Sequence, residues 1–203
     1  MQAAQRGLAP LKFTIDPAAS RFTVQAFVTG MLSAFGHSPT MSIRDFDGQL
    51  SFIPESFEKA QLRMTLKTTS LEVLDDMKND DRRQLVQKMN AEVLEIDRFP
   101  TAEYTSNGII VQKTNNGALS AHMDGDLAFH GVTHRQAIDA RVAEMGSTLR
   151  ISGEFSLRQS DYGIKPVSFA GGMLRLKDEL KFKFELMARK LDESVGNDQR
   201  QSP

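Results

Sequence analysis

The 203-residue sequence contains no cysteine and no tryptophan. Without cysteine, the protein has no disulfides, no thiolate metal ligands and no cysteine nucleophile. Its apolar side chains include 13 phenylalanines and 10 methionines. Because methionine adapts to irregular or flexible apolar partners, this composition suits an internal ligand cavity as well as an ordinary packed core.

An excess of positive charge is also missing, since 25 Lys and Arg residues face 26 Asp and Glu residues. Binding to nucleic acid requires a basic patch or stripe on the surface. We therefore expect no nucleic-acid partner.

Long apolar runs are absent as well. The longest uncharged stretch near the start, residues 27–43, contains Gly, Pro, Ser and His and is too polar to span a bilayer. We expect no stable membrane insertion. The first ten residues, MQAAQRGLAP, lack the apolar segment of a secretory signal, which predicts a cytoplasmic protein, or a periplasmic one if the start is processed.

Strict alternation of apolar and polar residues is the strongest signal present. In residues 149–157, Leu149, Ile151 and Phe155 share one face of an extended chain while Arg150 and Glu154 share the other. This pattern is typical of antiparallel strands with one dry face and one wet face. It predicts about nine strands, at 12–16, 21–29, 46–53, 61–67, 101–112, 119–129, 136–144, 149–157 and 181–190. Closure into a barrel or sandwich is the expected way to protect their edges.

Turn dipeptides and one helical segment complete this outline. Asp-Gly at 47–48, Asn-Gly at 107–108 and Asn-Asn-Gly at 115–117 predict turns between strands. From Asp80 to Asp97 the apolar residues Leu85, Met89, Val93 and Ile96 recur at helical spacing. Asp80 or Asp81 is the expected cap, and the Phe99-Pro100 step is expected to end the helix. One domain over residues 11–190 is predicted, with disordered ends at 1–10 and 191–203.

The segment FHGVTH, residues 129–134, raises the question of a metal site. Histidines four residues apart on a helix can share a zinc ion. However, predicted strands run into and out of this segment, and Gly131 lies in its middle. His130 and His134 are therefore expected to flank a hairpin connection and not to bind metal.

No catalytic signature is present. The sequence has no G-x-S-x-G motif, P-loop or G-x-G-x-x-G motif, and the acidic segment 75–81 lacks the order of a calcium loop. We expect no cofactor and no catalysis. One alternative stays open: a metal-dependent enzyme or metal-binding protein on the same barrel that uses His37 with His122, His130 or His134.

Five segments in order resemble the YceI-like family of lipid- and polyisoprenoid-binding proteins. They are FTIDPAASRFTVQAF (13–27), FDGQLSF (46–52), RFPTAEYTS (98–106), GDLAFHGVTH (125–134) and SGEFSLRQSDYGI (152–164). The resemblance extends from about Leu11 to Lys190.

This resemblance implies a mainly β fold: an extended, antiparallel, lipocalin-like barrel of about eight strands with one inserted amphipathic helix. It implies an apolar tunnel that holds an isoprenoid or fatty-chain lipid without catalysis, for carriage or storage. The expected ligands are a polyisoprenoid, an isoprenoid quinone, or a fatty acid or amide, and a homodimer is left open. Besides the metal-dependent alternative, a second one is left open: a barrel whose tunnel is filled by its own side chains.

The residues expected to bind the lipid lie on the dry faces of the strands and of the helix. They are Phe22, Val24, Ala26, Leu50, Phe52, Leu62, Met64, Leu66, Met89, Tyr104, Ala121, Met123, Leu127, Phe129, Phe155, Phe182 and Phe184.

Overall fold

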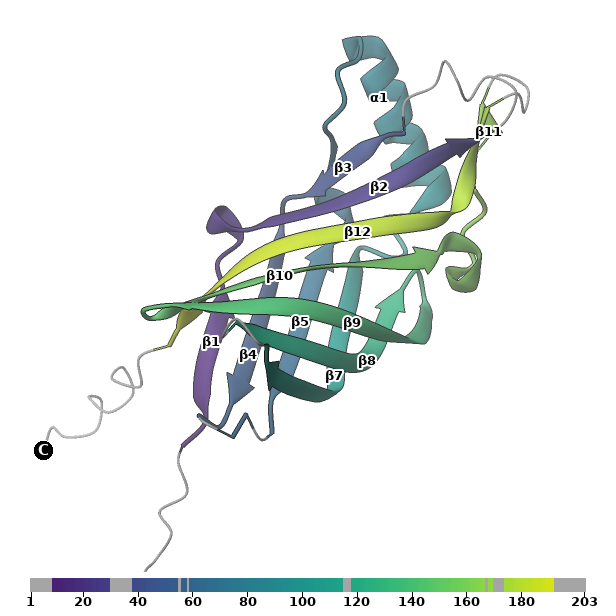
Figure 1. The fold of residues 1–203 in the computed structure, drawn as a ribbon. Coiled ribbons are helices and arrows are strands. Elements are labelled where there is room, and N and C mark those ends of the chain that lie inside the picture. Colours follow the sequence, from purple (N-terminus) through teal and green to yellow (C-terminus); the bar gives the residue numbers. More distant parts are fainter. Residues whose placement is uncertain are drawn as a thin grey trace, which may run out of the picture.

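The computed structural model describes residues 9–29, 38–54, 56–57, 59–114, 118–166, 168–169 and 174–191. Its strands form one antiparallel sheet that curls into a barrel, with a helix standing at one end (Figure 1). The strands are β1 (Leu11–Ile15), β2 (Arg21–Thr29), β3 (Thr40–Ile43), β4 (Phe46–Phe52), β5 (Gln61–Lys67), β6 (Leu71–Val73), β7 (Thr101–Lys113), β8 (Leu119–Phe129), β9 (Val132–Met145), β10 (Thr148–Arg158), β11 (Ser168–Phe169) and β12 (Leu174–Lys190). The helical elements are η1 (Pro17–Ala19), η2 (Thr68–Ser70), α1 (Asn79–Lys88), η3 (Met89–Val93) and η4 (Gln159–Tyr162).

The barrel closes where the first and last strands meet. β1 pairs with β4 on one side and with the end of β12 on the other, where Phe13 lies opposite Lys190. The resulting ring has eight strands in the order β1, β4, β5, β7, β8, β9, β10 and β12. This confirms the predicted antiparallel barrel, and closure removes the exposed edges that an open sheet would leave.

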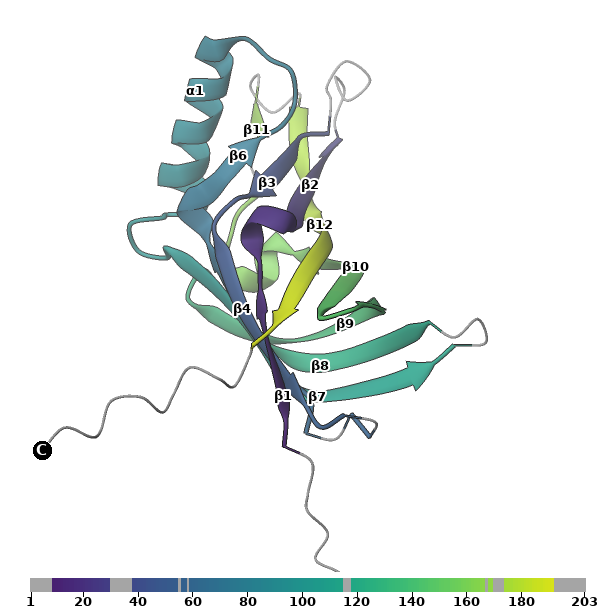
Figure 2. The same cartoon turned by 90° about the vertical axis from the view of Figure 1, so that its left-hand side faces the viewer.

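A smaller extension of the sheet carries the helix. β12 pairs with β2 from Arg175 to Glu185, and β3 and β6 continue the sheet beyond β2. Figure 2 shows α1 beside β6 and β3 at this end of the molecule. The barrel wall and the helix-bearing end are therefore built differently, from strands alone in one case and from strands plus a helix in the other.

The strands expected from alternation are all present, and those predicted at 21–29, 61–67 and 119–129 have the predicted bounds. The largest shifts are at β12, which begins at Leu174 and not at 181, and at β9, which begins at Val132 and not at 136. β3, β6 and β11 were not predicted. They have four, three and two residues, and alternation cannot be recognised over so short a length.

Two of the predicted turns are wrong. Asp47-Gly48 lies inside β4 and Asn107-Gly108 inside β7. A Cβ atom at position 48 would lie 2.2 Å from the Met64 sulfur, so this glycine allows close packing within the wall. Gly108 lies at a register shift between β7 and β8, which is a common place for glycine in a strand. The third turn, 115–117, lies outside the described residues.

The predicted helix is correct in place but not in length. α1 begins at Asn79 without a side-chain cap, and the wider helical turn of η3 ends at Val93. Neither Asp80 nor Asp81 caps it, since both lie inside the helix. Glu95 then adopts a positive φ of 43°, which a right-handed helix does not tolerate. The chain therefore leaves the helix before the Phe99-Pro100 step that was expected to end it.

The expected disordered ends, 1–10 and 191–203, lie outside the described residues except for positions 9, 10 and 191.

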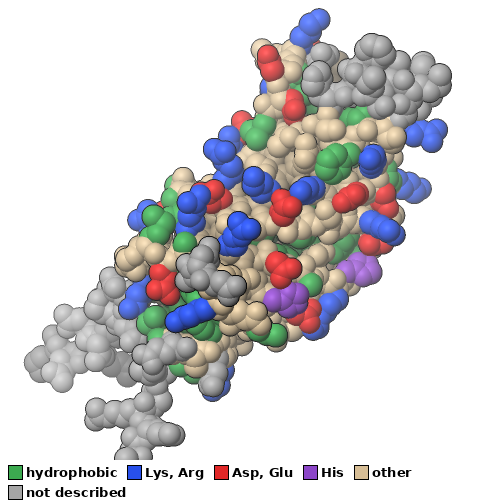
Figure 3. All heavy atoms as spheres, viewed as in Figure 1, with side chains coloured by type: hydrophobic (Ala, Val, Ile, Leu, Met, Phe, Trp, Pro, Cys, Tyr) green, Lys and Arg blue, Asp and Glu red, His purple; other side chains and the backbone are tan. Residues whose placement is uncertain are grey.

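On the face of the barrel that Figure 3 shows, acidic and basic side chains are interspersed. Arg150–Glu185 and Lys181–Glu154 are cross-strand ion pairs of 2.9 Å between half-exposed side chains. Such pairs add little to stability, so the apolar interior holds the barrel together.

None of the described helices is long and apolar enough to cross a lipid bilayer.

Candidate functional site

The interior of the barrel contains a cavity of about 100 Å³ enclosed by strands. We call it the strand-walled cavity. Its wall is made by residues of β2, β4, β5, β7, β8, β9, β10 and β12, together with Phe57 and Ala60 of the β4–β5 connection. Among the described residues that line it, Glu144 alone is charged. Alternation produces this wall because every second side chain of a strand points to the same face.

Tyr104 shows how the wall is held in shape. Its hydroxyl lies 3.3 Å from the carbonyl oxygens of both Met123 and Gln136, so it donates to the backbone and does not face the cavity as a free polar group. A Cβ atom at Gly125 would lie 2.6 Å from the Tyr104 ring, so only glycine leaves room for this ring. Burial raises the pKa of Tyr104 to about 12.

A second cavity, of about 150 Å³, lies at the helix-bearing end. We call it the helix-covered cavity. Residues of β2, β3, β10 and β12 line it, and Leu85, Met89 and Val93 cover it from α1 and η3. Lys88, Thr68 and Gln159 are its polar lining residues. Both volumes are several times the roughly 15 Å³ that one water needs, and large apolar cavities bind apolar ligands and not water.

The two cavities meet at a set of four shared residues, which we call the waist: Phe22, Leu66, Leu127 and Phe155. The interior is therefore neither solidly filled nor a single uniform tunnel. Its empty space lies in two parts, and the side chains of the waist border both of them.

Every residue expected to bind lipid lines at least one of these cavities. The waist residues line both. The others in the strand-walled cavity are Leu50, Phe52, Leu62, Met64, Tyr104, Ala121, Met123 and Phe184. The others in the helix-covered cavity are Val24, Ala26, Met89, Phe129 and Phe182. The structure thus brings these residues together, while their contact with a ligand stays a prediction.

Several lining residues were missed by the sequence reasoning. Ile138 and Val142 of β9, and Leu149 and Ile151 of β10, complete the strand-walled cavity. The same period-two alternation that identified these strands contained the necessary signal. Met41 of β3 also lines the helix-covered cavity, but its strand is too short to be recognised from sequence.

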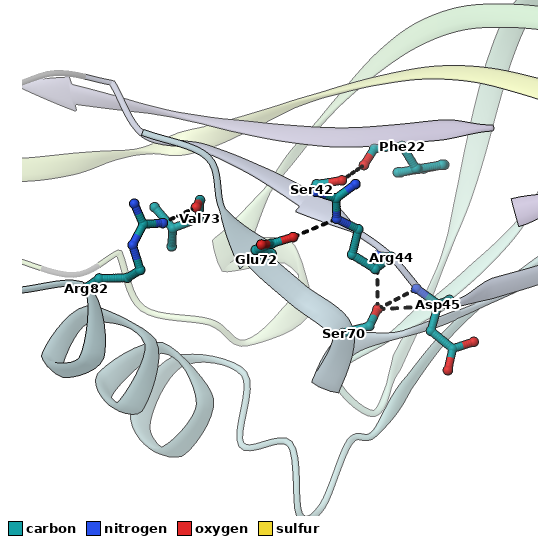
Figure 4. A network of polar contacts seen from close by, with 8 residues as sticks. All are labelled: Phe22, Ser42, Arg44, Asp45, Ser70, Glu72, Val73 and Arg82. Carbon is teal, nitrogen blue, oxygen red and sulfur yellow. Dashed lines mark hydrogen bonds and ion pairs between the residues drawn. The ribbon is translucent and has the colours of Figure 1, made fainter. Parts of the chain in front are cut away.

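The helix that covers the second cavity is attached to the sheet by one arginine. The Arg82 guanidinium donates to the carbonyl oxygens of Val73 and Asp75, the latter at 2.8 Å. Figure 4 shows this side chain reaching from α1 to β6. At the opposite end of β6, Ser70 accepts from the backbone N–H groups of Arg44 and Asp45 (Figure 4), which fixes the corner between β3 and β4.

The apolar residues of α1 and η3 that cover this cavity are buried only in part. Leu85, Val86 and Met89 are all of intermediate exposure, whereas Met64 in the barrel wall is 4% exposed. The cover is therefore held less firmly than the wall.

Three of the histidines have structural partners. The His122 Nδ1 lies 2.7 Å from an Asp139 carboxylate oxygen on the barrel surface. The ring nitrogens of His130 and His134 donate to the carbonyl oxygens of Tyr162 and Asp161, at 3.1 and 2.8 Å. The latter two contacts fix η4 against the β8–β9 turn, where His130 has a positive φ of 50°.

These histidines do not converge on a common point. Within the described part of the chain, no three His, Asp or Glu side chains come close enough together to hold a metal ion. His37, the fourth histidine of the metal hypothesis, lies outside the described residues. Among the described residues, His130 Nε2 is buried without a hydrogen-bond partner; it lies 3.6 Å from Glu95 Oε1 and its ring packs on Phe99 at 4.3 Å.

Together, the fold and its cavities define a class: an antiparallel barrel whose apolar interior has room for a ligand. The chain belongs to the YceI-like family, since the model of the YceI-like domain matches residues 13–188. Among curated relatives, a UPF0312 protein of Azotobacter vinelandii is 29% identical over 147 residues, which are 69% of this chain and 71% of that protein. A UPF0312 protein of Pseudomonas putida is 27% identical over the same length.

Solved structures share the fold at low sequence identity. BcnA of Burkholderia cenocepacia matches with a TM-score of 0.67 and 17% identity, over 85% of this chain and 98% of BcnA. A polyisoprenoid-binding domain from Saccharophagus degradans, implicated in plant cell wall breakdown, matches with a TM-score of 0.63 and 12% identity, over 88% and 98%. These similarities agree with the barrel described above.

Proposed function

We propose that this protein binds an amphiphilic lipid with a long hydrocarbon chain inside the barrel, for carriage or storage, and does not catalyse a reaction on it. The expected ligands are a polyisoprenoid, an isoprenoid quinone, or a fatty acid or amide. The observation that carries the proposal is the pair of adjoining cavities, whose lining is apolar apart from a few residues such as Glu144 and Lys88.

The energetics favour a chain lipid over a small polar ligand. Each methylene that moves from water into an apolar cavity gains about 0.8 kcal/mol. A chain of about ten carbons therefore gains about 8 kcal/mol, which is comparable with the cost of association. A polar ligand would gain little, because few groups in either lining can donate or accept hydrogen bonds.

Two comparisons support the proposal. The family model that matches nearly the whole barrel is the YceI-like domain, and one structural neighbour is a polyisoprenoid-binding domain. The alternative of a metal-dependent protein has no specific observation in its favour, because the described histidines point to separate backbone and carboxylate partners.

The test narrows the strand-walled cavity without adding charge. Ala121 lines this cavity and is 5% exposed, so Ala121→Phe places a ring where the chain would lie. The neighbouring His122 points outward, so His122→Phe adds the same ring to the surface. Native mass spectrometry of the purified proteins, with and without added farnesol and palmitate, measures the retained lipid.

We expect the wild type and His122→Phe to retain lipid, and Ala121→Phe to lose at least about tenfold in affinity, since about two buried methylenes are worth that much. Circular dichroism checks that each variant is folded. The proposal fails if the wild type carries no lipid and takes up neither probe. It also fails if folded Ala121→Phe binds as well as the wild type.

A further inference from the structure

The waist divides the interior at one level of the barrel. Its members come from four strands: Phe22 from β2, Leu66 from β5, Leu127 from β8 and Phe155 from β10. A chain lipid longer than either cavity has to pass between these four side chains. The waist therefore determines whether one chain can occupy both cavities.

Three members of the waist are fixed on both sides. Phe22, Leu66 and Leu127 are 6%, 7% and 7% exposed, and each lies between two paired strands. The Phe22 ring also lies 6.0 to 6.2 Å from the rings of Phe46, Phe182 and Phe184. Moving any of these three side chains would disturb a ladder or an aromatic cluster.

Phe155 is held differently. It packs against the core but is only partly buried, unlike the other three waist residues, which are buried. Its ring stacks on that of Phe182 with centroids 4.8 Å apart and planes at 5°.

The backbone at Phe155 is also paired on one side only. Among the described residues, the pairing of β10 with β9 ends at Glu154 opposite Asp139, one residue before Phe155. Phe155 itself pairs with Phe182 of β12, and β9 and β10 separate toward η4 (Figure 1). Of the four waist residues, Phe155 can therefore move at the smallest cost to its neighbours.

We propose that Phe155 determines the length of lipid chain that the barrel accepts. This inference rests on the proposed function. A short chain fits within one cavity and leaves the Phe155 ring stacked on Phe182. A longer chain displaces the ring and extends through the waist. The free energy needed to move this one side chain therefore determines how favourably a chain that extends beyond the first cavity binds.

The experiment compares chain-length preference among matched variants. Each folded protein is incubated with an equimolar series of saturated fatty acids from decanoate to docosanoate, and native mass spectrometry measures the occupancy by each acid. Phe155→Ala opens the waist. Phe155→Trp narrows it and is a second variant in case the first one fails to fold.

Two further phenylalanines provide comparisons. Phe13→Ala removes the same atoms from the core at a position that lines neither cavity, so it controls for general loosening of the barrel. Phe129→Ala widens the helix-covered cavity alone and should change the affinity for all chain lengths by a similar factor.

We expect Phe155→Ala to raise the occupancy ratio of docosanoate to decanoate about tenfold, as about two further buried methylenes would. Phe155→Trp should lower this ratio, while Phe13→Ala and Phe129→Ala should leave it near the wild-type value. If neither Phe155 variant changes the ratio while the wild type binds the acids, the inference is wrong and the proposed function stands. If Phe13→Ala or Phe129→Ala shifts it equally, volume and not the waist sets the length, which also overturns the inference. If the wild type binds no acid and no added prenol, the proposed function itself is wrong.

Discussion

The two cavities of this barrel are bounded in different ways. The strand-walled cavity is enclosed by residues such as Met64, Tyr104 and Met123, each 4% exposed and each on a strand that pairs on both sides. The helix-covered cavity is closed on one side by half-buried residues of α1 and η3, whose helix is attached to β6 through Arg82. Removing a wall strand would break two ladders, whereas moving the helix breaks no ladder, only the Arg82 hydrogen bonds and the packing of partly buried side chains such as Leu85 and Met89.

This difference separates two requirements of a lipid-binding barrel. A wall must keep its shape whether or not a ligand is present, and paired strands provide this because each backbone group is bonded across the ladder. A cover must open for a ligand to enter, and segments with few buried apolar contacts open at the lowest free energy. We therefore expect substitutions in the wall to change stability and substitutions in the cover to change ligand exchange.

The largest expected effect is on the wall at Gly125. A Cβ atom there would lie 2.6 Å from both the Thr105 carbonyl oxygen and the Tyr104 ring, so Gly125→Ala should lower the free energy of unfolding by about 3 kcal/mol. Gly108 lies in β7 with no atom within 4 Å of its added Cβ, and Gly108→Ala should change stability by less than about 0.5 kcal/mol. Urea denaturation measures both, and equal effects would contradict the close packing of the wall.

A methionine in each region allows a direct comparison. Met64 of the wall is 4% exposed, and Met64→Ala should cost about 3 kcal/mol of stability. Met89 of the cover is of intermediate exposure, so Met89→Ala should cost about 1 kcal/mol. Thermal or urea unfolding of the two variants checks the order. A larger loss for Met89→Ala would mean that the helix is an integral part of the core.

The pH dependence of stability tests the burial of Tyr104 in the wall. Burial raises its pKa in the folded protein to about 12, above the ordinary value of about 10. The folded state therefore keeps this proton when the unfolded state loses it. The contribution to stability is complete below about pH 10 and is lost as pH rises toward 12, by about 2 kcal/mol.

Tyr104→Phe lacks the titrating hydroxyl, so its stability should fall less than that of the wild type over the same range. Tyr162, whose pKa burial and the nearby Asp161 also raise, is present in both proteins and cancels from the difference. Urea unfolding at several alkaline pH values measures it. Parallel curves for the two proteins would show that the Tyr104 hydroxyl is accessible to water.

The same contrast explains what the sequence could predict. Alternation identified the wall strands and placed Met64, Ala121 and Met123 on the dry face, because a ladder enforces period two over many residues. Asp47-Gly48 was interpreted as a turn, but Gly48, like Gly125 in the correctly predicted strand 119–129, allows close packing against a neighbouring strand. Such contacts depend on register, which local patterns do not contain.

The cover was predicted less completely, for a related reason. The helical spacing of Leu85, Met89 and Val93 gave its apolar face, but the end of the helix at Val93 depends on the positive φ of Glu95 and not on the Phe99-Pro100 signal. The division of the interior at Phe155 was also not predictable. Nor was the end of the β9–β10 pairing at Glu154, one residue before Phe155, because the alternating pattern continues through both strands without interruption.

A small effect on stability, but the most informative one for the cover, is expected at Arg82. Arg82→Met keeps an apolar stem but removes the hydrogen bonds to the Val73 and Asp75 carbonyl oxygens, which should cost about 1 kcal/mol. If α1 is the part that opens, this loss should speed the release of a bound fluorescent fatty acid to acceptor vesicles about fivefold.

Arg83→Met is the matched control, because Arg83 is exposed and pairs with Asp80 within the same helix. Stopped-flow fluorescence measures both rates. Should both variants release the lipid at the wild-type rate, the ligand leaves by another route, and the separation of β9 and β10 near η4 becomes the next place to test.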